Sequence, residues 1–313
     1  MAETTETTPA PLHPGKVPAP PSGATDGGDV GGRFLTQSQL VRRRFVRHRA
    51  AMTALTVLVG FVVFVYVAPF FLGYSLTNLS AGSYEDPSPA HVFGTDQVGA
   101  DVFSLVMKGA QFSLQIGVLA TVIATVIGVV MGTFAGYLRR GADATISRVT
   151  DLFLVVPLQA AAAVLIAGVG GSWWLVGLVL GFFLWTPIAR VTRSEALALS
   201  QREFIEAARS AGATTWRVVT KHLVPNMIGT IVVNATLTLA LAVLTEAALS
   251  FIGLGVQIPD TSLGLVLNQN YTQLATRPWL FWAPFVAIVL ISLTINFIGD
   301  GLRDAFDPRQ TRT

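Results

Sequence analysis

The sequence predicts an all-helical integral membrane protein with six transmembrane helices. Of its 313 residues, 52% are hydrophobic and only 12% are charged, whereas soluble domains carry about 25% charged residues. Several apolar runs reach the length of about 20 residues that a helix needs to cross a bilayer. The chain has no cysteine and four widely spread histidines, so we expect no thiolate chemistry, no catalytic residue and no metal site.

The chain begins with two segments that precede the first apolar run. Residues 1–33 are rich in Thr, Pro, Ala and Gly without a periodic apolar face, which predicts a disordered tail. In residues 34–49, apolar residues alternate with arginines, which predicts a basic amphipathic helix on the inner membrane surface. A simple orientation signal for the next helix is an alternative interpretation, and both interpretations place this segment in the cytoplasm.

The apolar runs that we interpret as spans cover residues 50–72, 112–137, 152–170, 173–190, 228–254 and 280–299. They divide the chain into a first transmembrane helix (50–73), an external segment (74–111), a five-helix core (112–302) with a cytoplasmic loop (191–227), and a cytoplasmic tail (303–313).

The distribution of positive charge predicts the orientation of these spans. With the N-terminus inside, only Lys108 and Arg277 of the 21 lysines and arginines lie outside, which leaves 21 − 2 = 19 inside. Cytoplasmic segments of membrane proteins carry this excess. We therefore expect a multi-pass membrane protein with both termini in the cytoplasm. The bilayer explains the basic residues, so no nucleic-acid partner is expected.

The cytoplasmic loop contains a pattern that a simple connector does not need. Phe204, Ala207, Ala208 and Ala211 recur at the spacing of one helical face, and Gly212 follows them. The pattern predicts a short helix with a narrow apolar stripe that ends at the glycine. A docking site for a partner and a surface helix lying on its own membrane domain both remain open as interpretations.

A second short helix is predicted directly after this glycine. Thr214 or Thr215 is a suitable N-cap, and Trp216 would lie on the apolar side of the helix. Pro225 is expected to end it before the fifth span.

These stretches resemble a known family. "EAARSAG" (206–212), followed after nine residues by "HLVP" (222–225), is similar to the EAA loop of permease subunits of bacterial ABC importers. Four further stretches resemble the C-type membrane subunits of dipeptide and oligopeptide importers. They are "HVFGTDQVGADVFS" (91–104), "SRVTDLFLVVP" (147–157), "LTEAALSFIGLGVQIP" (244–259) and "GDGLRDAFDPR" (299–309). The resemblance covers residues 35–310. It departs from the family at Ala100 and Gln111, where an arginine is usual.

The resemblance implies a type I ABC importer permease fold and a set of partners. These are a homologous B-type permease subunit, one or two ATP-binding cassette subunits, an extracytoplasmic peptide-binding protein and the bilayer. The chain contains no G-x-x-x-x-G-K-[ST] motif, so ATP and Mg²⁺ would bind the partner subunits, and no cofactor or enzymatic activity is expected in this chain. The EAA loop would receive the ATPase through Glu206, Ala207, Ala208, Gly212, Trp216 and Pro225.

Polar residues in the predicted spans are further candidates. Glu246 is a carboxylate deep in the fifth span, where a charge must face protein or water. Glu246 either lines the translocation path or gate or forms a structural hydrogen bond, and both interpretations are open. The same two interpretations apply to Asn234 and Gln159. On the outer side, Asp96 and Asp101 are candidates for facing the binding protein.

Together these observations predict a permease subunit of an ATP-driven importer that carries dipeptides or oligopeptides across the cytoplasmic membrane. A nickel-chelate importer permease of the same family is an alternative. A proton-coupled secondary transporter that uses Glu246 is an alternative of a different class, and the predicted docking loop speaks against it.

Overall fold

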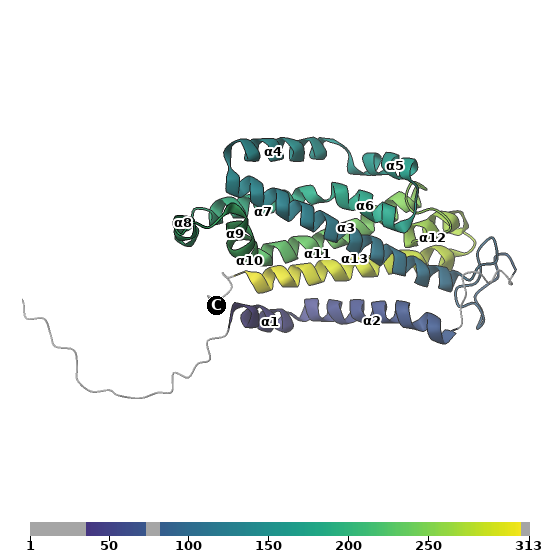
Figure 1. The fold of residues 1–313 in the computed structure, drawn as a ribbon. Helices are drawn as coiled ribbons and strands as arrows, with labels where there is room; N and C mark the ends of the chain where they lie inside the picture. The colour runs from purple at the N-terminus through teal and green to yellow at the C-terminus, as the bar shows by residue number, and fades with distance from the viewer. Residues whose placement is uncertain (1–35, 73–81, 308–313) are drawn as a thin grey trace, which may run out of the picture. The chain divides into compact units, whose positions relative to one another are not determined.

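The computed structural model describes residues 36–72 and 82–307, so the predicted tail 1–33 lies outside the described residues. The described part is built from helices (Figure 1). In chain order they are α1 (Gln37–Arg47), α2 (Arg49–Leu72), α3 (Val102–Leu138), α4 (Arg140–Val155), α5 (Leu158–Val169), α6 (Trp173–Phe183), α7 (Trp185–Leu199), α8 (Glu203–Ser210), α9 (Thr215–Val218), the π-helical turn η1 (Val219–Leu223), α10 (Val224–Asn226), α11 (Ile228–Phe251), α12 (Leu263–Asn270), the 3-10 turn η2 (Tyr271–Gln273) and α13 (Pro278–Phe306).

Five of the predicted spans are continuous apolar stretches of helix. Those long and apolar enough to cross a membrane are Arg49–Phe71, Val102–Leu138, Trp173–Leu199, Ile228–Phe251 and Pro278–Phe306. The predicted third span, 152–170, covers only the last residues of α4 together with α5, and these two helices are bent by 85° relative to each other. Val156 between them is extended because Pro157 disfavours helical geometry in the residue before it.

Several helices continue beyond their predicted ends. Helix α3 begins at Val102, so the predicted external segment 74–111 is shorter at its C-terminal end. Helix α7 continues to Leu199, and α13 continues to Phe306, inside the predicted tail 303–313. Buried apolar side chains at Val102, Val106 and Ala196 explain two of these extensions, because they keep each helix packed after the long apolar run has ended.

Helix α3 packs closely against α6 and α7. Gly128, Gly132 and Gly136 share one face of α3, four residues apart, and that face meets α7. A Cβ atom at Gly128 would lie 2.8 Å from the carbonyl oxygen of Trp185. The hydroxyl of Thr192 donates a 3.1 Å hydrogen bond to the Gly128 carbonyl. Small residues in this repeat let two membrane helices approach closely.

The remaining long helices form a second packed group. Helices α2, α11, α12 and α13 share a core with the first part of α3, and α2 runs beside α13 in Figure 1. The short helix α1 lies against the end of α13, where Arg44 Nη1 donates a 3.0 Å hydrogen bond to the carbonyl oxygen of Asp307. Helix α1 falls within the predicted amphipathic segment 34–49 and separates from α2 at His48.

Candidate functional site

Helix α8 is attached to the rest of the chain through one buried side chain. Ile205 is completely buried and belongs to an apolar cluster with Tyr137, Val218, Leu223 and other residues. The side chain of Arg209 stacks over the Tyr137 ring at 4.6 Å and donates a 3.2 Å hydrogen bond to its hydroxyl. The predicted apolar stripe did not include Ile205, although it is the one large apolar residue of α8 outside the stripe.

The predicted stripe itself faces away from the chain. Phe204 is 44% exposed, Ala207 and Ala211 are exposed, and Ala208 is half-buried. The acidic residue Glu206, in the first turn of α8, is also exposed. A helix that lay on its own membrane domain through this stripe would bury it. The geometry therefore favours the docking interpretation over the surface-helix interpretation.

Gly212 ends α8 in a defined motif. Its φ of +81° lies in the left-handed region, where side chains with a Cβ are strained. The N–H of Gly212 donates to the carbonyl of Arg209, and the N–H of Ala213 donates to the carbonyl of Ala208. This pair of bonds is a Schellman motif. A Cβ at Gly212 would meet no atom within 4 Å, so the backbone conformation alone calls for glycine here.

The second short helix begins as predicted and ends differently. The hydroxyl of Thr214 accepts a hydrogen bond from the N–H of Arg217, which makes Thr214 the N-cap. Trp216 is 66% exposed and stacks on Phe134 of α3 at 6.3 Å. Pro225 does not end the helix as predicted, because the chain continues through the π-helical turn η1 and α10 toward α11.

The π-helical turn explains why proline is tolerated. The N–H of Val224 bonds to the carbonyl of Val219, five residues earlier, and Pro225 has no N–H to donate to the next carbonyl. The side chain of Asn226 donates a 2.6 Å hydrogen bond to the His222 carbonyl. Single π-helical turns of this kind are frequent at functional sites.

Glu246 lies in a hydrogen-bonded network inside the chain. It is completely buried, and its carboxylate accepts hydrogen bonds from the hydroxyls of Ser113 (2.8 Å) and Ser250 (2.7 Å). These hydroxyls accept in turn from the backbone N–H groups of Leu263 (3.2 Å) and Val256 (3.0 Å). The structure thus realises the hydrogen-bond interpretation of Glu246, and in this conformation the carboxylate lines no open path. Neither serine stands out in the sequence, because serine is common in membrane helices.

The two other candidate path residues lie apart from Glu246. Asn234 is half-buried on α11 and donates a 2.8 Å hydrogen bond to the Thr230 carbonyl of its own helix. Gln159 is exposed in the first turn of α5, just after the bend at Pro157. The structure brings none of the three candidates together into one site.

The two acidic candidates in the segment before α3 are buried, so neither carboxylate is exposed on the surface of the described chain. Asp96 is 6% exposed, and its Oδ1 accepts hydrogen bonds from the N–H groups of Val98 and Ala100. Asp101 is 7% exposed and precedes α3, with Oδ2 at 3.7 Å from Nδ1 of His91. The Asp96 carboxylate therefore stabilises the turn that leads to α3.

Among the described residues, no group of three or more His, Cys, Asp or Glu side chains is placed to hold a metal ion. The exposed faces of α8 and α9 around Phe204, Glu206, Ala207 and Trp216 form one candidate surface, which we call the coupling surface.

Two protein families match the chain. Residues 128–312 match the family described as binding-protein-dependent transport system inner membrane component. Residues 36–87 match the family described as N-terminal TM domain of oligopeptide transport permease C.

Relatives with assigned names match over most of their length. The chain is 38% identical over 279 residues to the oligopeptide transport system permease protein OppC of Mycobacterium tuberculosis (strain ATCC 25618 / H37Rv), covering 88% of this chain and 96% of the relative. It is 38% identical over 284 residues to OppC of Salmonella typhimurium, covering 90% and 93% of the two chains. It is 37% identical over 284 residues to OppC of Escherichia coli (strain K12).

A solved structure shares the fold. A chain from the inward-facing MetNI methionine ABC transporter superposes with a TM-score of 0.53 at 23% sequence identity, covering 65% of this chain and 96% of that chain. At this identity the likeness establishes the fold alone.

Proposed function

Because this chain belongs to the family of binding-protein-dependent transport system inner membrane components, we propose that it is the permease subunit of an ATP-driven importer of dipeptides or oligopeptides. The names of its relatives support a peptide cargo over a nickel chelate. Its partners would be a homologous permease subunit, one or two ATP-binding cassette subunits that bind ATP and Mg²⁺, and an extracytoplasmic peptide-binding protein.

The observation that carries this proposal is the exposed apolar stripe of α8. Phe204, Ala207 and Ala211 are exposed although Ile205 fixes the same helix to the membrane domain. Small side chains let a second backbone approach, and Phe204 offers an apolar anchor for a groove in the partner. We place this surface in the cytoplasm together with both termini, because 19 of the 21 basic residues then lie inside, counting 21 − 2.

The attachment of α8 gives the surface a mechanical role. Ile205 belongs to the same cluster as Val219 and Ile231, which lead into α11. Motion of a docked ATPase would pass through this cluster to α11, and the network around Glu246 would carry it to the outer segment that contains Val256 and Leu263. Glu246 would thereby position the segment around Val256 and Leu263, which would form the gate on the outer side.

Reconstitution of the purified importer complex in liposomes tests the proposal. Peptide transport should require ATP and should continue when an ionophore removes every ion gradient. Transport driven by a proton gradient without ATP would instead establish a secondary transporter, and ATP-dependent transport of a nickel chelate that peptides do not inhibit would refute the peptide cargo.

A further inference from the structure

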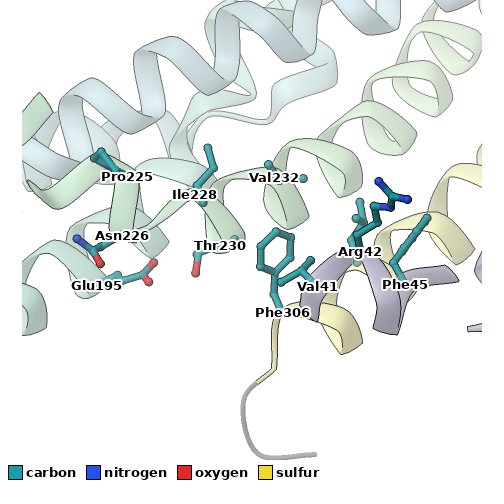
Figure 2. Close-up of a pocket in the computed structure, with 12 residues that line it drawn as sticks. Val41, Arg42, Phe45, Glu195, Pro225, Asn226, Ile228, Thr230, Val232 and Phe306 are labelled. Atoms are coloured by element: carbon teal, nitrogen blue, oxygen red, sulfur yellow. The ribbon is translucent and has the colours of Figure 1, made fainter. Parts of the chain in front are cut away.

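Helix α1 uses one of its faces to pack against the end of α13. The partly buried residues of this face recur three and four positions apart, and they are Val41, Arg44, Phe45 and His48. Figure 2 shows Val41 beside Phe306 of α13, and Nε2 of His48 lies 3.3 Å from Oδ2 of Asp304. The larger apolar side chains that an amphipathic helix would insert into a bilayer are thus partly taken up by protein in this chain.

The remaining face of α1 is basic and exposed. Its arginines, together with the first residue of α2, are Arg42, Arg43, Arg47 and Arg49. None of them forms an ion pair with another described residue. The sequence contains no acidic residue between Asp29 and Glu85. Arginines four positions apart on a helix repel each other, so this face favours a negatively charged partner.

The exposed surface continues from α1 along the first span. In α2 only 17% of the apolar stretch is buried, against 39–61% in the other four continuous spans. Val46 on α1 is exposed, and so are Val57, Phe64 and Val67 on α2, which share one side of that helix because they are seven and three positions apart. Exposed apolar side chains of a span contact the acyl chains of the bilayer. The arginines therefore lie at one end of an apolar surface.

A partner for this surface must bring negative charge to the arginines and an apolar chain to α2. An acidic protein surface would match the first requirement alone, whereas a phospholipid with a negatively charged headgroup joins both parts in one molecule. We propose that α1 and the adjoining part of α2 bind an anionic phospholipid such as phosphatidylglycerol. Its phosphate lies at Arg43 and Arg47, one helical turn apart, and its acyl chains lie along α2. Basic segments beside a span are attracted to the anionic cytoplasmic leaflet in this way.

Phosphatidylcholine supplies the comparison, because it has the same phosphate and acyl chains but carries a neutralising ammonium group. The complete importer complex is reconstituted in nanodiscs with equal amounts of phosphatidylglycerol and phosphatidylcholine and extracted in detergent, and the bound lipid is measured by native mass spectrometry. The wild type should retain phosphatidylglycerol at least about fivefold better, which corresponds to one arginine near an anionic surface. Equal retention of the two lipids would overturn the proposal, whether or not the complex transports peptides.

Variants then test the arginines directly. The double substitution Arg43→Gln and Arg47→Gln should bring the two lipids to nearly equal retention, while Arg43→Lys with Arg47→Lys keeps the charge and the preference. Arg202→Gln, which changes an exposed arginine just before α8, is the control and should retain the preference. A preference that survives the double glutamine substitution would overturn the assignment, and so would its loss in millimolar inorganic phosphate. Loss of the ATPase subunit from that variant with an unchanged lipid preference would assign the arginines to a protein contact instead.

Discussion

The hydroxyl of Ser113 on α3 donates a 2.8 Å hydrogen bond to the carboxylate of Glu246 on α11, although the two residues lie 133 positions apart in the chain. The same hydroxyl accepts the N–H of Leu263 at the start of α12. The Ser113 side chain thus joins α3 and α11 to the start of α12. Removing Glu246 would leave the hydroxyls of Ser113 and Ser250 without their acceptor.

Replacement of this carboxylate by an apolar side chain should destabilise the protein. Glu246→Leu is expected to lower the stability by about 1–3 kcal/mol, because it leaves buried hydroxyls unpaired. Glu246→Gln keeps one acceptor oxygen and should lower the stability less. Peptide uptake should still decrease, because the segment that contains Val256 and Leu263 is held less firmly. Thermal unfolding of the purified complex measures the first effect, and a melting temperature of Glu246→Leu equal to that of the wild type would contradict the network.

The glycine face of α3 should tolerate no larger side chain. A Cβ at Gly132 would collide with the Ala189 carbonyl and the Thr192 hydroxyl, so Gly132→Leu should destabilise the protein by at least the roughly 1–3 kcal/mol typical of overpacking. Gly60→Leu on α2 is the matched control, because a Cβ there meets no atom within 4 Å. Membrane abundance and melting temperature are measured for both variants. Equal values would show that α3 and α7 do not pack at this face.

The stability should depend on pH through Asp101. Burial of its carboxyl group raises the pKa of Asp101 above the ordinary value, against the opposing effects of nearby backbone N–H groups and His91. An acid with a raised pKa in the folded state favours folding while it is protonated, and this contribution is lost as the pH rises through the folded-state pKa. Asp101→Asn should therefore raise the melting temperature at pH 8 relative to the wild type, and less so at pH 4.

Asp86 supplies the control for this experiment, because its carboxylate is exposed in the same outer segment. The change in melting temperature between pH 4 and pH 8 should be the same in Asp86→Asn as in the wild type. An Asp101→Asn variant that is less stable than the wild type at pH 8 would show that the carboxylate charge is favourable where it lies.

The orientation can be measured with single cysteines, because the chain has none of its own. Ser83 and Ser210 are both exposed, in the outer segment and on α8 respectively. In intact spheroplasts, an impermeant thiol reagent should label Ser83→Cys and leave Ser210→Cys unlabelled, and disruption of the membrane should expose the second site. The opposite pattern of labelling would invert the proposed topology.

Most of the fold was predictable because long apolar runs have few alternatives in a bilayer. The bend at Val156 was not predicted, although Pro157 marks it, because the apolar composition continues through it. The early start of α3 was missed because Lys108 and Gln111 interrupt the apolar run, while packing of Val102 and Val106 continues the helix.

The coupling surface was predictable in outline, because its helices follow from local signals such as Gly212 and Thr214. Its attachment was not predictable, since the cluster that holds Ile205 together with Tyr137 joins distant parts of the chain. The burial of Asp96 and Asp101 was missed for the same reason. A carboxylate in a polar loop looks exposed until its neighbours are known.

Gly212 lies between the two helices of the coupling surface and offers the most informative substitutions. Gly212→Val places a branched side chain in the left-handed region, at a cost of about 1–2 kcal/mol, which is too small to unfold the bundle and large enough to misdirect α9. Gly212→Asn is the matched control, because asparagine tolerates this conformation. Glu206→Lys reverses the exposed charge on α8 and should weaken docking independently.

The most direct measurement is the ATP-dependent peptide uptake of these variants in reconstituted complexes of equal membrane abundance, together with the amount of ATPase subunit that co-purifies. We expect Gly212→Val and Glu206→Lys to lose uptake, with less ATPase bound or with hydrolysis no longer stimulated by substrate, while Gly212→Asn retains both activities. Normal uptake in both Gly212→Val and Glu206→Lys would contradict the account and leave α8 and α9 as a surface loop.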